Sequence, residues 1–412
     1  MSSKLYNIKY IDLFAGIGGF HEAMKKADPT SKCIAAVEFD KASAEIYEKS
    51  HGIRPLGDIT DNKVIEKIDR IIDKEGLDIL FAGFPCQAFS KAGKQEGFQD
   101  QTRGTLFFSI KEILKKHKPK YFVLENVRNL VSHQKGGVKT MDVIEKVLKE
   151  LGYSFTYSIL SPHRIRDKNI PNMRERIFIY GILEEKNEEG RNIKEIKVNI
   201  ESQFKKQSEV DFNFFKEINN YLIDSKPLEI PETKLKVLEI WEELNQKIIS
   251  ANGRLISPIW LDVMFNKNLQ KSELEWKQKL INKNLQFFNE YKNIIKEWYK
   301  KHDKLSSYPP SFRKFEWNAN HSINSIYEGI IQFRPSGIRV KKPDYFPTFV
   351  AINQTPIIGW EKRYPTPNEI TKLFGFSNVK YDNGDSEAYK QLGNTVSVDV
   401  TKIVIENLLQ WE

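Results

Sequence analysis

A cysteine between a proline and a glutamine is the residue of this sequence best suited to nucleophilic chemistry. Cys86 stands in Gly83-Phe84-Pro85-Cys86-Gln87, at the end of the apolar run of residues 78–83. The glycine and the proline turn the backbone out of the strand that this run predicts. We therefore expect the thiol on a turn at the carboxyl edge of a sheet, where it could attack an electrophile. An ordinary strand end is the alternative for this segment taken alone.

An acid and two arginines could work beside that thiol. Glu125 follows the apolar run of residues 121–124, so we expect it at the same sheet edge as Cys86. Arg174 and Arg176 precede a further strand, and residues two apart in an extended chain point to one side. Such a set could hold a polar planar ring. The alternative for Glu125 is an acid at a helix N-terminus, and the alternative for the two arginines is a surface salt-bridge cluster.

The N-terminal segment predicts a ligand-binding turn. Residues 12–20 read Asp-Leu-Phe-Ala-Gly-Ile-Gly-Gly-Phe, which is typical of a strand, a glycine turn and a helix start. Glu38 ends the second predicted strand, where nucleoside-binding sheets place a carboxylate for ribose hydroxyls. Asp58 is expected to end a third strand and could reach an adenine edge. The glycine spacing is not the full dinucleotide fingerprint, and a plain tight turn is the alternative.

Short apolar strands alternate with helices over the first 183 residues. This order predicts an α/β fold with a doubly wound, mostly parallel sheet and helices on both faces. Ligands of such sheets bind outside the carboxyl ends of the strands. The expected strands are residues 8–14, 33–38, 79–82, 121–124, 155–160 and 176–182, and a helix is expected at 107–117.

The composition changes after residue 183. Residues 184–328 are rich in lysine, asparagine, glutamate and aromatic residues, and the segment 262–314 has twelve Lys or Arg against six Asp or Glu. We expect a pair of helices here that carries Trp276, Phe287 and Trp298. Its tryptophans are most simply core residues, and its lysines are either a solvated face or a basic platform for DNA phosphates.

The bulk properties narrow the function. The chain has 412 residues and a formal net charge of +9, which favours a polyanionic partner such as nucleic acid. Two cysteines exclude a disulfide framework and indicate a reducing compartment, and no Cys/His spacing suggests a metal site. The N-terminus leaves no room for a signal peptide, and no apolar run approaches the ~20 residues of a membrane helix. We therefore expect a cytoplasmic protein that is not bound to membranes.

Taken together, the motifs resemble those of the carbon-5 cytosine DNA methyltransferases of bacterial restriction–modification type. Asp-Leu-Phe-Ala-Gly-x-Gly-Gly-Phe, Gly-Phe-Pro-Cys-Gln, Glu-Asn-Val, Arg-x-Arg and Gly-Asn-Thr-Val occur in the order found in that family. The resemblance covers most of the chain and implies a Rossmann-like methyltransferase fold. Residues 1–183 plus 385–412 would form the catalytic and cofactor-binding domain, and 184–384 the target-recognition domain. Asn172 stands where the family usually has glutamine.

The resemblance also implies a reaction. Sequence-specific methyl transfer from S-adenosyl-L-methionine to carbon 5 of a flipped-out cytosine would proceed through addition of Cys86 to carbon 6. Glu125 would bond ring nitrogen 3 and the exocyclic amine, and Arg176, with Arg174 close by, the ring carbonyl. Positions that match the family's cofactor contacts are Phe14, Gly16, Ile17, Gly18, Glu38, Phe39, Asp58, Ile59, Gly83, Pro85, Leu106, Asn394 and Val396. Within the loop that closes over the base, DNA contacts are expected from Gln87, Ser90, Lys91, Lys94 and Arg103.

The expected partner is double-stranded DNA, with the enzyme acting as a monomer close to the nucleoid. A cognate restriction endonuclease that acts separately is an open option. Two alternatives share the motifs: a tRNA cytosine-5 methyltransferase and a catalytically silent DNA-binding relative. The long basic insert favours duplex DNA over tRNA, and the complete set of Cys86, Glu125 and Arg176 favours catalysis.

Overall fold

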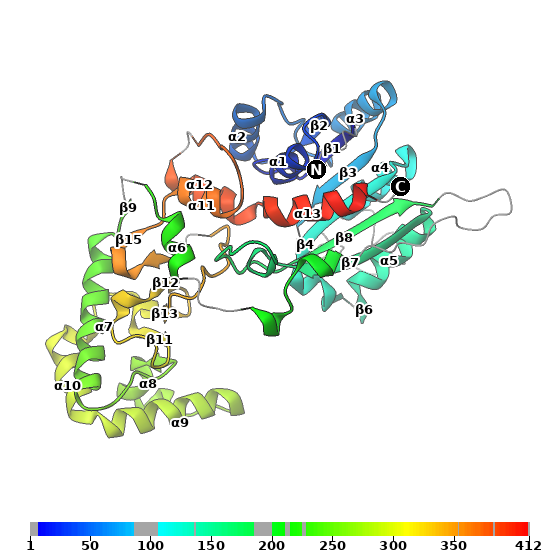
Figure 1. The fold of residues 1–412 in the computed structure, drawn as a ribbon. Coiled ribbons are helices and arrows are strands. Elements are labelled where there is room, and N and C mark those ends of the chain that lie inside the picture. Colours follow the sequence, from blue (N-terminus) through cyan, green and yellow to red (C-terminus); the bar gives the residue numbers. More distant parts are fainter. Residues whose placement is uncertain are drawn as a thin grey trace. The chain divides into compact units, whose positions relative to one another are not determined.

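The computed structural model describes residues 7–85, 106–135, 137–184, 200–210, 215–224, 228–352, 354–381 and 384–410. The chain forms two compact units, the first made of Met1–Asp211 with Ile370–Glu412 and the second of Phe212–Glu369 (Figure 1). The sequence prediction divides the chain after residues 183 and 384 instead. Residues 200–210 group with the first unit, because buried Phe204 forms a β-bridge with Ile165. The roles assigned to the two parts stay predictions.

The first unit contains a six-stranded sheet with the order β2-β1-β3-β4-β8-β7. Neighbouring strands from β2 through β1 and β3 to β4 run parallel, whereas β8 is antiparallel to both β4 and β7. This topology confirms the doubly wound, mostly parallel α/β sheet. The strands are β1 (Lys9–Leu13), β2 (Lys32–Val37), β3 (Ile79–Gly83), β4 (Tyr121–Val127), β7 (Tyr153–Leu160) and β8 (Arg176–Leu183), and β5 (Gln134–Lys135) with β6 (Val138–Lys139) forms a separate ribbon.

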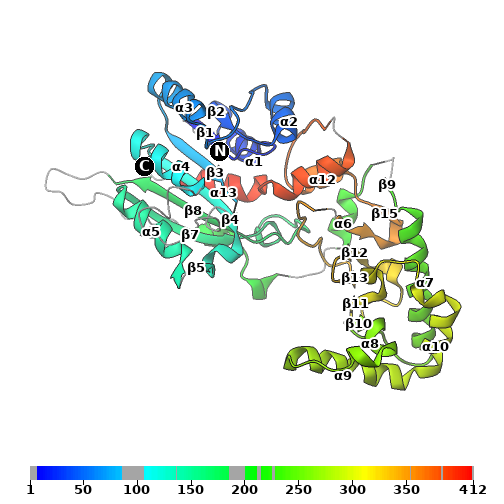
Figure 2. The same cartoon turned by 180° about the vertical axis from the view of Figure 1, so that it is seen from behind.

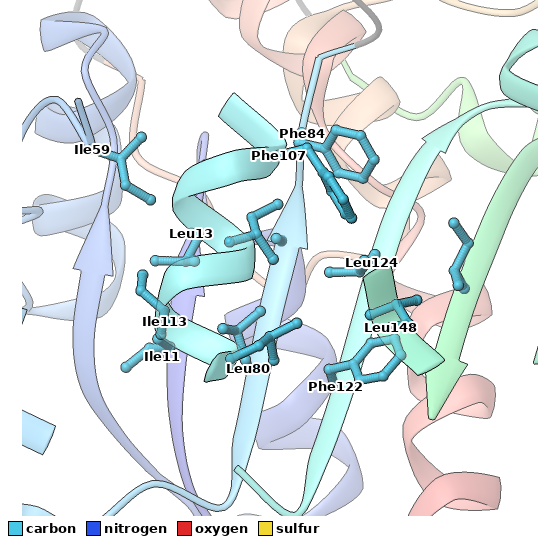
Figure 3. Packing of buried hydrophobic residues seen from close by; sticks show 14 of the residues in the cluster. Ile11, Leu13, Ile59, Leu80, Phe84, Phe107, Ile113, Phe122, Leu124 and Leu148 are labelled. Carbon is cyan, nitrogen blue, oxygen red and sulfur yellow. The ribbon is translucent and has the colours of Figure 1, made fainter. Parts of the chain in front are cut away.

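One face of this sheet is covered by α3 (Asn62–Glu75), α4 (Leu106–His117) and α5 (Thr140–Glu150). Alternate strand residues such as Leu13, Leu80 and Leu124 contribute to the apolar cluster under these helices (Figure 3). Burial of each large side chain stabilises the fold by about 1.5–3 kcal/mol. The cluster gives the carboxyl ends of β1, β3 and β4 a rigid base.

The opposite face is covered by α1 (Gly19–Ala27), α2 (Lys41–His51) and α13 (Val398–Leu409). The ring of Phe20 stacks on that of Phe81 in β3, with their centroids 5.2 Å apart. The last helix, α13, packs alongside α1 near the start of the sequence (Figures 1 and 2). The first unit also contains α12 (Asp385–Asn394), and the second boundary between the two units in the sequence falls within α11 (Pro367–Leu373).

The second unit contains a seven-stranded sheet with the order β10-β11-β13-β12-β14-β15-β9. The expected helix pair is confirmed as α9 and α10. The helices are α6 (Phe215–Tyr221), α7 (Glu232–Ser250), α8 (Leu261–Phe265), α9 (Glu275–Glu290) and α10 (Lys292–Lys301). The strands are β9 (Leu228–Glu229), β10 (Ile259–Trp260), β11 (Lys314–Asn318), β12 (Ile330–Arg334), β13 (Gly337–Lys341), β14 (Ile357–Ile358) and β15 (Arg363–Tyr364).

Three tryptophans of this unit, Trp241, Trp298 and Trp317, are buried core residues, as predicted. Trp241 and Trp298 are fully buried, and their ring nitrogens donate to the carbonyls of Phe312 and Ile240. Trp276 is the exception, since it is 61% exposed at the start of α9. Within the described ranges, no helix has the length and apolar character needed to cross a membrane.

Candidate active site

The backbone that leads to Cys86 is fixed to the neighbouring strand. Gly83 pairs in register with Glu125 of β4, and the side-chain amide of Asn126 donates to the carbonyl of Phe84 over 2.8 Å. Phe84 is buried. The chain therefore leaves β3 along a defined path up to Pro85. Asn126 stands in the Glu-Asn-Val motif, but nothing near it in the sequence marks it as a positioning residue.

Glu125 and Arg176 form an ion pair at this edge. The Nε atom of Arg176 lies 3.1 Å from Oε1 of Glu125, and both side chains are largely buried. Burial raises the pKa of the Glu125 carboxyl, and the charges of Arg176 and Arg174 partly oppose that rise. Glu125 therefore takes up a proton more readily than an exposed glutamate would. A carboxyl of this kind can both accept and donate hydrogen bonds to a ring.

Arg174 has a different environment from Arg176. Its guanidinium is buried and donates to the carbonyls of Gly393 and Thr395 over 3.0 and 2.7 Å. It thus holds the Gly-Asn-Thr-Val segment against the sheet while it also lines the cavity. Both arginines are expected to contact one ring. Arg176, which pairs with Glu125, fits this expectation better than Arg174, which binds backbone carbonyls.

The glycine turn after β1 is held by Glu38. One carboxylate oxygen of Glu38 accepts from the amide of Gly16 and the other from the amide of Asp40, both over 2.8 Å. Gly16 and Gly18 have φ angles of 54° and 91°, which glycine adopts without strain. Burial raises the pKa of Glu38. The carboxylate therefore connects the turn to the end of β2.

These groups surround one cavity of about 560 Å³. Glu125, Arg174 and Arg176 lie along it together with most of the predicted cofactor residues. Those residues are Phe14, Gly16, Glu38, Phe39, Asp58, Ile59, Gly83, Pro85, Leu106 and Asn394. Ile17, Gly18 and Val396 do not line it; Ile17 is fully buried and Val396 packs close to Gly19. Lining residues that the sequence did not suggest include Ser43, Asn126, Lys390 and Gln391.

The composition of the cavity wall fits a nucleoside that carries a positive charge. Phe39 is 74% exposed beside the cavity and offers an aromatic face for stacking. Glu38 and Asp58 supply carboxylates. Asp58 does not end a strand as predicted, because it lies in a turn where it accepts from the amide and hydroxyl of Thr60. This local bonding removes it from the sheet and leaves it at the cavity wall.

Cys33 is unsuited to nucleophilic attack. It is partly buried in β2 near Tyr47, and burial raises its pKa to about 12, so it stays a thiol at neutral pH. The chain has two cysteines. Cys86 is therefore the remaining candidate. Cys86 lies outside the described residues, as do the predicted DNA contacts Gln87, Ser90, Lys91, Lys94 and Arg103, so their roles stay predictions.

Substitution of Gly18 by alanine tests the glycine turn. A Cβ atom there would lie 2.2 Å from Nε2 of His51, which hydrogen-bonds the carbonyl of Ile17. We expect G18A to lower the free energy of unfolding by about 3 kcal/mol or more, through the clash together with backbone strain. G52A is the matched control, since Gly52 has a φ of 73° with open space around it. It should cost only about 1 kcal/mol. If denaturant titrations show that G18A and G52A lose the same free energy of unfolding, the clash with His51 is not what makes Gly18 necessary.

The fold and the cavity define an α/β methyltransferase, and comparisons with known proteins specify which kind. Residues 8–410 match the family described as C-5 cytosine-specific DNA methylase. The chain belongs to this family and is a DNA (cytosine-5)-methyltransferase. It is 30% identical to the Type II methyltransferase M.AluI of Cellulosimicrobium cellulans, over 98% of this chain and 92% of that protein. With M.BanI of Aneurinibacillus aneurinilyticus it shares 32% identity over 98% and 96% of the two chains.

The similarity to other relatives is concentrated in part of the chain. The Type II methyltransferase M.HpaII of Haemophilus parainfluenzae is 48% identical over 42% of this chain and 45% of its own. Among solved structures, the Dnmt2 methyltransferase of S. pombe has a TM-score of 0.51 at 19% identity, with 98% of each chain covered. A putative DNA modification methyltransferase of an E. coli prophage has a TM-score of 0.53 at 14% identity, over 98% and 99% of the chains. The two structural similarities support the fold alone.

Proposed function

We propose that this enzyme methylates one cytosine within a specific sequence of duplex DNA, with S-adenosyl-L-methionine as the methyl donor. The observation that carries the proposal is the shared cavity of about 560 Å³. The turn of Gly16 and Glu38 lines it together with the ion pair of Glu125 and Arg176. Pro85, the residue before Cys86, also lines it. One space thus suits a methyl donor and a pyrimidine ring beside a thiol.

The residues around the turn suit S-adenosyl-L-methionine. When bound, this group would supply an electrophilic methyl on a positively charged sulfur. The carboxylate of Glu38 has lone pairs left for ribose hydroxyls after it accepts from two backbone amides. Phe39 would stack on the adenine, and Asp58 would accept a hydrogen bond from the adenine edge. Gln391 is held by Ser43 and Asp40, which keeps its side chain at the wall of the cavity.

The residues at the other end suit a cytosine that has left the helix. The Cys86 thiolate would add to carbon 6 and leave carbon 5 electron-rich enough to take the methyl. The electron pair of the ring moves toward nitrogen 3, where protonated Glu125 would donate. Its raised pKa supports that role. Arg176 would donate to the ring carbonyl while it keeps its contact with Glu125. After carbon 5 has taken the methyl and the donor's sulfur has left as a neutral thioether, a base would take the proton at carbon 5, and the electron pair of that C–H bond would expel Cys86 as a thiolate.

Sequence specificity is assigned to the second unit together with its flanking segments, in line with the prediction for residues 184–384. Relatives over the full chain are named Type II methyltransferases. We expect this enzyme to act as a monomer in the cytoplasm on chromosomal DNA. It would protect its recognition sequence from a cognate restriction endonuclease that acts separately.

Labelled methyl transfer onto two substrates tests the proposal. We expect incorporation into unmethylated genomic DNA and none into bulk tRNA, because the basic second unit favours a duplex. Bisulfite sequencing of DNA from cells that express the chain should then find one cytosine protected in one short sequence. Incorporation into tRNA alone would overturn the proposal. Methylation of cytosines without a common sequence would overturn its specificity.

A further inference from the structure

A basic pocket in the second unit lies outside the cavity described above. It has a volume of about 700 Å³ and is lined by residues of α8 and α10 and of the segments that follow each of these helices. In both views, α8, α9 and α10 gather at the end of the unit far from β9 and β15 (Figures 1 and 2). We call it the α10 pocket. Its charged lining residues are Asp262, Lys296, Lys300, Lys304 and Arg313.

The charge of the α10 pocket is not neutralised by the protein. Four cationic side chains line it against one carboxylate, that of Asp262, which pairs with Arg313 at 3.2 Å. Among the described residues, Lys296, Lys300 and Lys304 make no ion pair. Lysines elsewhere on the same helices do so, as when Lys279 pairs with Glu275 at 2.7 Å and Lys301 with Glu243 at 2.8 Å. A face of the helix that only contacts solvent would not explain why three lysines without acidic partners line the same pocket.

Two stacked aromatic side chains line the α10 pocket. The rings of Phe265 and Tyr299 stack with centroids 3.9 Å apart and planes 9° from parallel. Burial and the charge of Asp262 raise the pKa of Tyr299, so its hydroxyl keeps its proton and can donate. The stacked rings carry no charge, whereas four lysine and arginine side chains of the lining are positively charged. This combination suits an anion with some apolar surface, such as a sugar-phosphate.

The backbone after α10 is strained where it carries Lys304 into the pocket. Asp303, Lys304 and Leu305 have φ angles of 45°, 57° and 54°, the left-handed region that non-glycine residues rarely adopt. Each such residue costs about 1–2 kcal/mol. Leu305 is fully buried and anchors the segment to the core of the unit. Strain of this kind tends to persist where a side chain has a function.

We propose that the α10 pocket binds the phosphodiester backbone of the DNA substrate through Lys296, Lys300 and Lys304. This assignment rests on the proposed function, since it requires that the enzyme binds duplex DNA. Lys296 and Lys300 lie one helical turn apart and face the same hollow, so a single sugar-phosphate strand can contact both. Contacts to phosphates add affinity and set the position of the protein without reading bases. The pocket is therefore a source of sequence-independent affinity.

The variant K296Q/K300Q/K304Q tests this proposal. We expect its affinity for duplexes with and without the recognition sequence to fall by a similar factor, about tenfold or more near physiological salt. The slope of log K against log salt should become shallower by about 1 for each lysine that contacts a phosphate. The control K236Q/K279Q/K301Q removes the same charge from lysines of this unit that are paired with Glu232, Glu275 and Glu243. It should bind DNA nearly as the parent does.

A second measurement uses the unmodified enzyme. Acylation of lysines followed by mass spectrometry should show that duplex DNA protects Lys296, Lys300 and Lys304 but not Lys236 or Lys279. Equal protection by inorganic phosphate at the same phosphate concentration would overturn the assignment to DNA. Equal loss of affinity in the two triple variants would overturn the pocket itself. If either of these results is found while the parent methylates DNA normally, the pocket assignment fails and the proposed function stands. If the parent neither binds nor methylates DNA, the pocket assignment and the proposed function both fail.

Discussion

Replacement of Cys86 by alanine is expected to abolish methyl transfer while DNA binding remains. The variant lacks the group that would add to carbon 6, and an unactivated cytosine is a poor nucleophile at carbon 5. Loss of a nucleophile of this kind lowers turnover by about 10⁴-fold or more. Labelled methyl incorporation into duplex DNA measures the change, and fluorescence anisotropy with the same duplex measures binding.

The other cysteine provides a matched control. Cys33 is a neutral thiol whose pKa is raised to about 12 by burial, so C33A removes the same atom from a site without nucleophilic character. It should lose only the stability of a small partly buried side chain and should keep turnover near that of the parent. Substantial activity in C86A, or inactivity in C33A with the fold intact, would contradict the assignment of Cys86.

The second large effect is expected from E125Q. The amide keeps the shape of the carboxyl but cannot deliver a proton to ring nitrogen 3, so turnover should fall by about 10²–10⁴-fold. The affinity for the methyl donor should change little, because Glu38 and Phe39 would make those contacts. Single-turnover rates with saturating DNA, together with calorimetric titration of the donor, separate the two quantities.

E125Q also leaves Arg176 without its partner charge, and the loss of a buried ion-pair partner can destabilise a protein by about 3–5 kcal/mol. The unfolding free energy of E125Q must therefore be measured beside its rate. The double variant E125Q/R176Q removes both charges and should recover stability without recovery of turnover. Recovery of both together would show that Glu125 serves the fold and not the reaction.

Much of the first unit could be predicted because its signals are local. Apolar runs of strand length, such as residues 121–124, fall within observed strands, and the helix predicted at 107–117 is α4 (Leu106–His117). The start of α11 is also set locally, since the hydroxyl of Thr366 accepts from the amide of Glu369. Asp58 was misassigned because a turn that bonds Thr60 looks, in sequence, like the end of a short strand.

Other features of the site depend on partners that are distant in sequence. Nothing near Arg174 indicates that its guanidinium would bind the carbonyls of Gly393 and Thr395. Arg334 of β12 and Arg339 of β13 both pair with Glu316 of β11 in the second unit, and nothing near these residues in the sequence indicates that. The order of the strands in the sheet brings these partners together, and this order cannot be inferred from the spacing of the residues along the chain.

The packing of α13 beside α1 has a consequence for how this enzyme is made in the cell. A ribosome completes every strand of the first unit before it translates Gly393 and Thr395, whose carbonyls Arg174 binds. Asn394, which lines the cavity, also emerges late. A nascent chain therefore needs residues 393–395, which are translated after every described strand of the first unit, before its cavity is complete. We expect a chain that stops before residue 385 to lack methyl-transfer activity, because it lacks these carbonyls and this part of the cavity wall.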